Sequence, residues 1–389
     1  MPQENILTMA AARLAGIPYA LSRRRPLHEP HKALILQTCC LSQVMLATPM
    51  LAALSEAFPK ARFDWALSSW ARPAVASNKR LTELVDMGET DLADRSWRQI
   101  GQLVLQLRAE RYDTAFIPSG SALLSYIAWQ AGIHQRIGLN IHGRGFAHTV
   151  PVTPPAGVTD RGSQGLLLAE AAGVDRAITT SVSMEFTPPD SVRTAATRRL
   201  IEEVDWLGDA PLIILHPGGG CNPRGERPLV RWPEERFALL GSYLAHAYWA
   251  RLILVGAEDE RALVQDLAGM LAAKTTNYCG RLGLNELAAF CEVADLYVGN
   301  DTGPSHVAAA TGCRTLVIYG PTDPAISQPY TTMGNVRTVW SGPGQQHVDR
   351  PFSWDAGVTA EEVIKVADEM LQMPAERQKT MAILSRSRG

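Results

Sequence analysis

The fold is decided by LYVGNDTGPSHVAAATG, residues 296–312, which joins an apolar strand, a polar turn and a helix of small residues. Pro304 suits the first turn of that helix, because the N–H that it lacks would be unpaired there anyway. The free N–H groups of the turn and the positive end of the helix dipole favour an anion such as a diphosphate. Gly303 would let a ligand approach the backbone closely. The plainer interpretation is that Asp301 or Thr302 only caps the helix, and the spacing alone leaves both open.

A second glycine-rich turn lies upstream, where HPGGG at residues 216–220 ends another apolar strand. Consecutive glycines after a strand can form a backbone cradle for phosphate, although they can also form a flexible loop. Two such turns at strand ends within one domain together favour a site for a phosphorylated ligand.

Short apolar runs alternate with longer amphipathic runs on both sides of these turns. This βαβ rhythm predicts an α/β fold with two doubly wound, Rossmann-like domains, and a ligand site beyond the carboxyl ends of the strands. Strands are expected at 33–37, 62–67, 113–118, 211–220, 251–257, 296–300 and 314–320. Helices are expected at 46–58, 96–110, 232–248, 259–273 and 284–294.

The same pattern suggests the division of the chain. We expect an N-terminal extension over 1–30, a first domain over 31–186, a linker and helix over 187–209, a second domain over 210–357, and a C-terminal helix within 358–389. The Pro-containing entry to the charged helix places the hinge in the linker. A loop is expected over 342–354, and the C-terminal helix could pack back on the first domain.

Composition excludes several classes of protein. A net charge of −2 over 389 residues argues against a protein that holds nucleic acid electrostatically, whereas a compact anion needs only a few local donors. Six cysteines without a CxxC pair predict reduced thiols in a cytoplasmic protein, not a disulfide framework or a zinc site. Residues 5–21 lack a secretory pattern and leave two interpretations: a helical extension packed on the body, or a peripheral, amphipathic contact with the inner face of the membrane. The oligomeric state is left open.

Several segments together resemble a known family. HPGGG is followed by RWPEERFALL (231–240), LVGAEDE (254–260), NDTGPSHVAAATG (300–312) and IYGPTDP (318–324), in the order and spacing typical of glycosyltransferase family nine, which includes the lipopolysaccharide heptosyltransferases. The resemblance covers roughly residues 33–330 and is more specific in the C-terminal half. It implies a GT-B fold, an ADP-heptose-like donor, inversion at the sugar carbon, and neither a metal nor another cofactor. The acceptor could be the lipopolysaccharide core, a protein hydroxyl or a small metabolite.

The resemblance also implies which residues contact the donor. The matching positions are Asp301, Gly303 and His306 around the diphosphate and sugar, Gly218 and Gly219 in the phosphate-contacting turn, Glu260 as a ribose-hydroxyl acceptor, and Leu282 beside the adenine. Gly220, Thr302 and Pro304 complete the expected donor-binding set. Two alternatives stay open: His306 could be a core histidine bonded to a backbone group, and Glu260 a solvated carboxylate at a helix start.

The chain departs from the family where a lysine usually neutralises the departing diphosphate. That lysine stands two residues before the Trp-Pro pair, and the position is Val230 here. An arginine can bind a diphosphate through two hydrogen bonds, with a different reach. We therefore predict that Arg224, Arg227 or Arg231 replaces the lysine.

A second departure affects the general base. The family usually carries Gly-Asp after the first strand, and that Asp resembles the base for the acceptor hydroxyl. Here the pair is Ser42-Gln43, and residues 33–55 contain no Asp, Glu, His or Lys. A missing base typically costs on the order of 10²–10⁴-fold in rate.

Three hypotheses follow from the missing base. The base comes from elsewhere in the first domain, with candidates His142, His148, Asp113 and Asp160; or the acceptor is a nucleophile that needs little deprotonation, such as an amine; or the enzyme is slow or inactive. The main prediction is an inverting glycosyltransferase that moves a heptose-like sugar from an ADP-sugar. The alternative is a catalytically impaired protein that binds sugar-nucleotides and has lost its base. A nucleotide-sugar epimerase is disfavoured, since residues 39–44 hold no GxGxxG.

Overall fold

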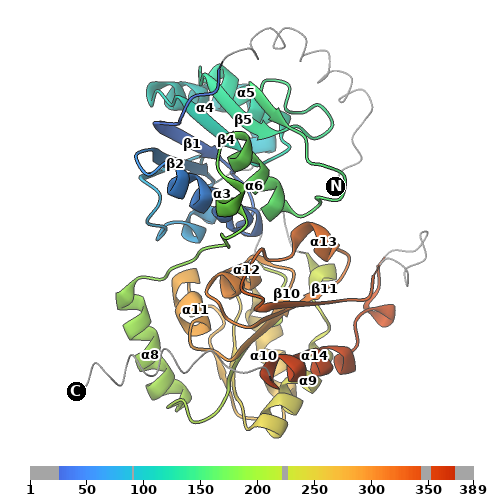
Figure 1. The fold of residues 1–389 in the computed structure, drawn as a ribbon. Helices are drawn as coiled ribbons and strands as arrows, with labels where there is room; N and C mark the ends of the chain where they lie inside the picture. Colours follow the sequence, from blue (N-terminus) through green and yellow to red (C-terminus); the bar gives the residue numbers. More distant parts are fainter. Residues whose placement is uncertain (1–25, 90–91, 221–226, 343–351, 373–389) are drawn as a thin grey trace.

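The computed structural model describes residues 26–89, 92–220, 227–342 and 352–372. The chain forms two domains, each built on a sheet of six parallel strands with helices on both faces (Figure 1). The first sheet contains β1 (Lys32–Leu36), β2 (Arg62–Leu67), β3 (Glu83–Asp86), β4 (Thr114–Ile117), β5 (Gln135–Leu139) and β6 (Val150–Val152). The second contains β7 (Leu212–His216), β8 (Arg251–Leu254), β9 (Thr275–Asn277), β10 (Leu296–Asn300), β11 (Thr315–Tyr319) and β12 (Val336–Trp340).

Both sheets have the same strand order. The first reads β3-β2-β1-β4-β5-β6 and the second β9-β8-β7-β10-β11-β12, so the order reverses between β1 and β4 and between β7 and β10. This is the Rossmann order, in which a crevice opens at the reversal beyond the carboxyl ends of the strands. The predicted pair of Rossmann-like domains is therefore confirmed.

The seven strands expected from apolar runs are present, because strands buried on both faces need such runs. The segment expected as a third strand is the fourth in chain order, β4, since β3 precedes it. The sequence does not predict β3, β5, β6, β9 and β12. Their sequences are short or carry polar residues, a glycine or a proline, and β3, β6, β9 and β12 lie toward the sheet edges, where less apolar surface is buried.

The helices connect these strands. In the first domain they are α3 (Leu41–Ala57), α4 (Trp97–Ala109), α5 (Ala122–Gln130), α6 (Arg161–Ala171) and α7 (Arg176–Thr179), with 3₁₀ turns η1 (Ser69–Ala74) and η2 (Leu92–Asp94). In the second they are α8 (Asp190–Val204), α9 (Glu234–Tyr248), α10 (Arg261–Met270), α11 (Leu284–Cys291), α12 (Gly303–Ala310), α13 (Pro324–Ser327) and α14 (Ala360–Gln372), with η3 (Pro228–Val230), η4 (Glu258–Glu260) and η6 (Trp354–Ala356). Over the described ranges, no helix combines the length and the apolar character needed to cross a membrane.

Helix α3 begins five residues before the predicted start. Cys40 precedes it with a φ of 67°, so the chain turns sharply from β1 into the helix. Pro49 lies inside the helix and cannot donate a backbone hydrogen bond to the Met45 carbonyl. The Thr48 hydroxyl donates to that carbonyl instead, at 2.7 Å, so the helix continues through the proline.

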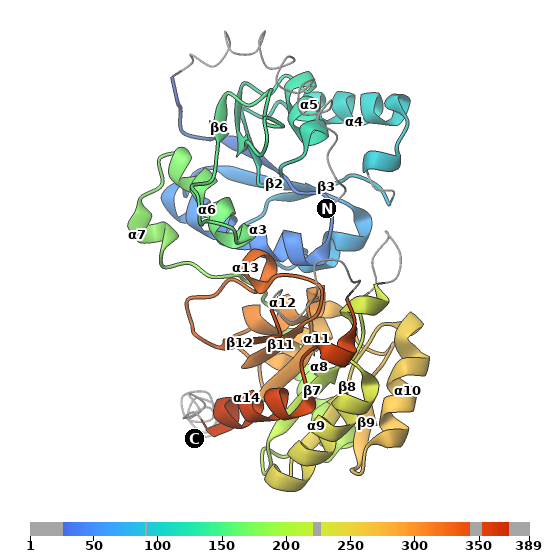
Figure 2. The same ribbon diagram turned by 90° about the vertical axis from the view of Figure 1, so that its right-hand side faces the viewer.

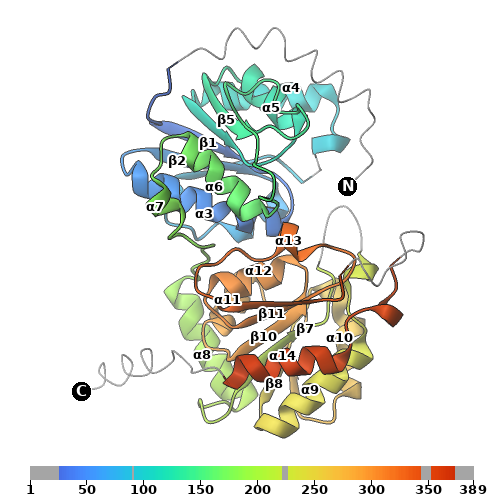
Figure 3. The ribbon, with the colours of Figure 1, turned by 45° about the vertical axis from the view of Figure 1, so that its right-hand side comes forward.

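The structure corrects two expectations about the segments that begin and end the second domain. The linker over 187–209 contains α8, which packs against α11 and belongs to the second domain's core. The C-terminal helix does not pack back on the first domain over its described length. Helix α14 lies along α9, and Val363 and Ala367 join the second domain's core (Figure 3). The extension expected over 1–30 and the loop over 342–354 lie largely outside the described residues.

The two domains meet through helices at the carboxyl ends of both sheets. Helix α12 packs against α3, and Val307 and Ala309 share one apolar cluster with Val44 and Met50 (Figure 2). The contact is closest at Gly303, where an added Cβ would lie 2.2 Å from the Leu41 side chain. The backbone approach that was predicted for a ligand at Gly303 is thus made by Leu41 of the first domain.

Candidate functional site

A crevice of about 900 Å³ lies between the domains, within the usual size range of small-molecule sites. The second domain lines it with residues from the ends of β7, β8 and β10, and the first domain with residues around η1. Among the lining residues are His216, Gly220, Glu260, Leu282, Gly303 and Pro304 of the second domain, and Leu41, Ser69, Trp70, Pro73 and Glu89 of the first. The crevice therefore contains five of the predicted donor-binding residues.

Glu260 holds the HPGGG turn in place. Its Oε1 accepts the Gly220 N–H at 3.0 Å, its Oε2 accepts the Ala257 N–H at 2.9 Å, and His216 Nε2 lies 3.5 Å from Oε2. The side chain is only 2% exposed, so the solvated-carboxylate alternative is wrong. Because the Gly220 N–H is already bonded, it is not a free donor for phosphate in this structure.

The charge of Glu260 is favoured despite its burial. Burial acts to raise the pKa of Glu260, but His216 and the two backbone N–H groups act in the opposite direction and lower it to about 2. Glu260 is therefore a carboxylate at neutral pH, with one edge on the crevice. A carboxylate can accept hydrogen bonds beyond these, so the predicted contact with a ribose hydroxyl stays a prediction.

Asn300 joins the two glycine-containing turns and was not singled out from the sequence. Its Nδ2 donates to the carbonyls of Pro217 and Gly218, both at 2.9 Å, and its Oδ1 accepts the Trp232 N–H at 3.1 Å. The side chain is fully buried at the end of β10. Asn300 thereby sets the position of the HPGGG turn relative to the start of α12.

The start of α12 has no side-chain cap. Thr302 occupies the N-cap position without capping the helix through its side chain. The Asp301 carboxylate turns the other way, accepting the Thr322 hydroxyl at 2.7 Å and the Ser327 hydroxyl at 3.3 Å. The simple capping interpretation is therefore wrong for both residues. Burial raises the pKa of Asp301, while these hydroxyls and the charge of Arg227 oppose that shift.

His306 is buried one turn further into α12, with 1% of its surface exposed. Neither of its ring nitrogens has a hydrogen-bond partner among the described residues, so the interpretation as a core histidine bonded to the backbone is wrong. Burial lowers the pKa of His306 to about 3, and the positive charge of Arg161 acts in the same direction. The ring is neutral at pH 7.

Two of the three predicted arginines are described, and both lie at the HPGGG turn. A Cβ built at Gly219 would lie 3.2 Å from the Arg231 Nε and 3.2 Å from the Arg227 carbonyl. The Arg227 side chain is exposed, and its charge reaches Asp301. Val230, at the position predicted for the family's lysine, is buried, with 2% of its surface exposed. Arg224 lies outside the described residues.

At the position predicted for the family's base stands an amide, Gln43. Gln43 lies in the first turn of α3, and its Oε1 accepts a hydrogen bond from Gln37 Nε2 at 2.9 Å. Neither amide can take up a proton usefully at neutral pH. Cys39 and Cys40 lie between β1 and α3, next to this turn.

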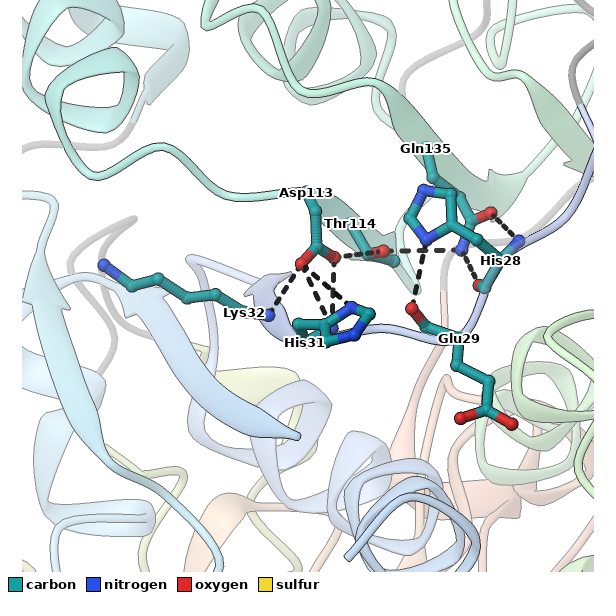
Figure 4. Close-up of polar contacts among 7 residues, drawn as sticks. All are labelled: His28, Glu29, His31, Lys32, Asp113, Thr114 and Gln135. Atoms are coloured by element: carbon teal, nitrogen blue, oxygen red, sulfur yellow. Dashed lines mark hydrogen bonds and ion pairs between the residues drawn. The ribbon is translucent and has the colours of Figure 1, made fainter. Parts of the chain in front are cut away.

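Three of the four candidate bases lie away from the crevice. Asp113 accepts the backbone N–H groups of His31 and Lys32 where β1 begins, at the end of the strands opposite to the crevice (Figure 4). His148 is buried against Gly138 and Gly145 in the first domain. His142 is exposed and does not line the crevice.

Asp160 is the candidate that lies at the domain interface. Its carboxylate caps α6 by accepting the Ser163 N–H at 2.7 Å. The neighbouring Thr159 hydroxyl donates across the interface to the Ala325 carbonyl at 2.9 Å. Two further charged residues were missed: Glu89, an exposed carboxylate in the crevice wall, and Arg161, next to Asp160. Neither carries a local motif, so only their place in the fold reveals them.

In the ranges that the structure describes, no group of three or more His, Cys, Asp or Glu side chains is placed to share a metal ion.

Comparison with known proteins gives consistent matches. A family model described as glycosyltransferase family 9 (heptosyltransferase) matches residues 100–350. Lipopolysaccharide heptosyltransferase 3 of Escherichia coli is 24% identical over 343 residues, which cover 84% of this chain and 96% of that protein.

Solved structures with the same fold include a glycosyl transferase family 9 protein from Veillonella parvula, with a TM-score of 0.74 at 20% identity, covering 90% of this chain and 99% of that one. The structure described as E. coli ADP-heptose lps heptosyltransferase II has a TM-score of 0.67 at 18% identity and covers 87% of this chain and 98% of its own. The predicted GT-B fold is thereby confirmed.

Proposed function

We propose, given that this chain belongs to glycosyltransferase family 9, that it is an inverting transferase that moves a heptose-like sugar from an ADP-sugar to an acceptor hydroxyl. One observation carries the proposal: the HPGGG turn, Glu260 and the start of α12 border a single crevice at the strand-order reversal of the second domain. Ligands of doubly wound domains bind at that reversal. The name of the similar E. coli structure supports ADP-heptose as the first donor to test.

The donor would lie along the second domain. Leu282 would contact the adenine and Glu260 a ribose hydroxyl, which places the diphosphate between Gly219 and the uncapped start of α12. Backbone N–H groups and the helix dipole would stabilise the negative charge there. Arg231 is the best replacement for the family's lysine, since it lies against Gly219 and is only partly exposed.

The reaction would be one displacement at the anomeric carbon of the sugar. The acceptor oxygen forms a bond to that carbon, the bond from the carbon to the β-phosphate oxygen breaks, and ADP leaves with the electron pair. Positive groups at the diphosphate lower the barrier, because charge develops on that oxygen in the transition state. The acceptor proton must pass to a base of the first domain or to water. Asp160 and Glu89 are the carboxylates of that domain to test first, since both lie on the side that faces the second domain.

A sugar-nucleotide-binding protein with little or no activity is the second candidate. The hydrogen bond from Gln37 to Gln43 favours it, because an amide pair fills the place of the usual base. Lipopolysaccharide core sugars are the acceptors that the relatives' names suggest for the active alternative.

The test is calorimetric binding of ADP, UDP, GDP and their sugars, followed by measurement of released nucleoside diphosphate with and without lipopolysaccharide-core acceptors. Tight binding of an ADP-sugar with acceptor-dependent ADP release is the expected result. Tight binding without turnover on any acceptor would favour the second candidate, and no binding of any nucleotide-sugar would overturn both.

A further inference from the structure

We propose that Arg161, on the first domain, binds the diphosphate of the donor when the two domains are closed. The inference rests on the proposed function and adds to it a donor contact that comes from the acceptor side of the crevice. Arg161 belongs to none of the segments that carry the family resemblance to the donor site.

The residues on both sides of Arg161 already contact the second domain. The Thr159 hydroxyl donates to the carbonyl of Ala325 in α13 at 2.9 Å. On the other side, a Cβ added to Gly162 would lie 2.6 Å from the Tyr330 side chain, so only glycine permits this approach. The first turn of α6 is therefore docked on the second domain. The hydroxyls that bind Asp301, those of Thr322 and Ser327, come from that same segment around α13.

Arg161 is half-buried in this contact. Burial lowers its pKa from the ordinary value for arginine, and Cys40 and Asp301 oppose that shift. The group nevertheless stays charged, as arginine does in proteins. Within the described part of the chain, no hydrogen bond or ion pair joins the guanidinium to another side chain. The Asp301 carboxylate is bonded instead to the hydroxyls of Thr322 and Ser327. A half-buried charge without a partner is only partly hydrated, which favours an anionic ligand beside it.

A second, independent observation lies on the facing helix. His306 in α12 is 1% exposed, and both of its ring nitrogens lack a partner in the described structure. The two residues belong to facing elements: the first turn of α6 contacts the segment around α13, and hydroxyls of that segment bind Asp301 just before α12. The neutral imidazole can donate one hydrogen bond to an anion next to the guanidinium. Buried polar groups without partners are exceptional in folded proteins. The His306 ring, the half-buried Arg161 guanidinium and the uncapped start of α12 together indicate a site for an anion.

A charge from the first domain would add to the one on the donor side. Val230 is buried at the position predicted for the family's lysine, and Arg231 is the proposed replacement in the second domain. A guanidinium that is contributed by the first domain would add a second positive charge only in the closed state, thereby coupling tight donor binding to domain closure. It would also contact the β-phosphate oxygen as that oxygen leaves the sugar.

The test compares wild-type protein with Arg161→Gln, Arg161→Lys and the matched control Arg176→Gln, an exposed arginine of α7 in the same domain. Calorimetry measures the Kd of ADP and of adenosine for each, and thermal unfolding checks that each variant folds. Loss of one charge-assisted pair should weaken ADP binding about tenfold or more in Arg161→Gln. The Kd of adenosine should not change, Arg161→Lys should recover part of the ADP affinity, and the control should match wild type.

Equal ADP affinities of wild type and Arg161→Gln would overturn this inference and leave the proposed function intact. An unchanged Kd for ADP with a raised KM for the acceptor would also overturn it, since Arg161 would then contact the acceptor. A parallel loss of ADP and adenosine affinity would mean that Arg161 only docks the domains. Wild-type protein that binds neither ADP nor an ADP-sugar would instead overturn the proposed function, and this inference with it.

Discussion

The carboxylate of Glu260 occupies the space that a side chain at Gly218 would need. A Cβ built at Gly218 would lie 2.1 Å from Glu260 Oε1 and 2.2 Å from Oε2, distances that no real contact allows. Glycine at 218 is thus required by a side chain of the same domain, 42 positions further along the chain.

Gly218→Ala should therefore expel Glu260 from its place under the HPGGG turn. We expect a loss of about 1–3 kcal/mol in the free energy of unfolding, since the Gly220 and Ala257 N–H groups lose their acceptor. Donor affinity should fall at least tenfold as the turn shifts. Chemical denaturation and calorimetry measure the two effects.

Gly101→Ala is the matched control for this variant. Gly101 lies in the exposed face of α4, with nothing within 4 Å of an added Cβ, so alanine should be neutral or stabilise by up to about 1 kcal/mol. If Gly218→Ala behaved like the control, the proposed role of Glu260 in holding the turn would be wrong.

His306 should make the protein sensitive to mild acid. The pKa of His306 is about 3 in the folded state, below the ordinary value of 6.5. Between these two values the imidazole is protonated in the unfolded chain but neutral in the folded chain. Stability should then fall as the pH falls through 6.5. Between pH 7 and pH 5 this one group should cost about 2 kcal/mol.

The measurement is denaturant unfolding of wild type and His306→Gln at pH 8, 7, 6 and 5. The glutamine variant lacks the titration, so its stability should decline less below pH 7, while the two proteins should run parallel from pH 8 to pH 7. Parallel curves down to pH 5 would show that His306 does not differ between the folded and unfolded states.

Arg231 should contribute more to donor binding than Arg227. Arg231 is partly exposed and lies against Gly219, whereas the Arg227 side chain is exposed and its charge is better screened by solvent. We expect Arg231→Ala to raise the Kd of ADP tenfold or more and Arg227→Ala to raise it less than about threefold at physiological salt. Unchanged ADP affinity in both variants and in Arg224→Ala would contradict the replacement of the lysine by an arginine.

Gln43→Asp should increase the rate of transfer. The change places a carboxylate in the first turn of α3, the helix that packs against α12 of the second domain. There it could take up the acceptor proton. A base is typically worth on the order of 10²–10⁴-fold in kcat. Released ADP is measured against acceptor concentration, with Gln43→Asn as the control that keeps an amide.

A different result would identify a base that the first domain already has. No gain in Gln43→Asp, together with a loss of a hundredfold or more in Glu89→Gln or Asp160→Asn, would mean that the first domain already supplies its own base. The second candidate function would then be untenable.

The sequence alone determined the two Rossmann-like domains and the donor side of the crevice. Buried parallel strands need continuous apolar runs, and the turns after β7 and β10 need glycine, so both leave local signatures.

Only the tertiary structure decided the environment of Glu260, because its burial depends on the approach of Gly218 from another strand. The tertiary structure also decided the position of α14. Its apolar face could have packed on either domain, and it packs on α9 of the second domain. Arg161 could not be identified from its neighbours in sequence, since the side chains that give it a role lie across the domain interface, more than 130 positions away. Local patterns record what a segment must become, whereas charge, burial and unpaired donors depend on which distant segments it meets.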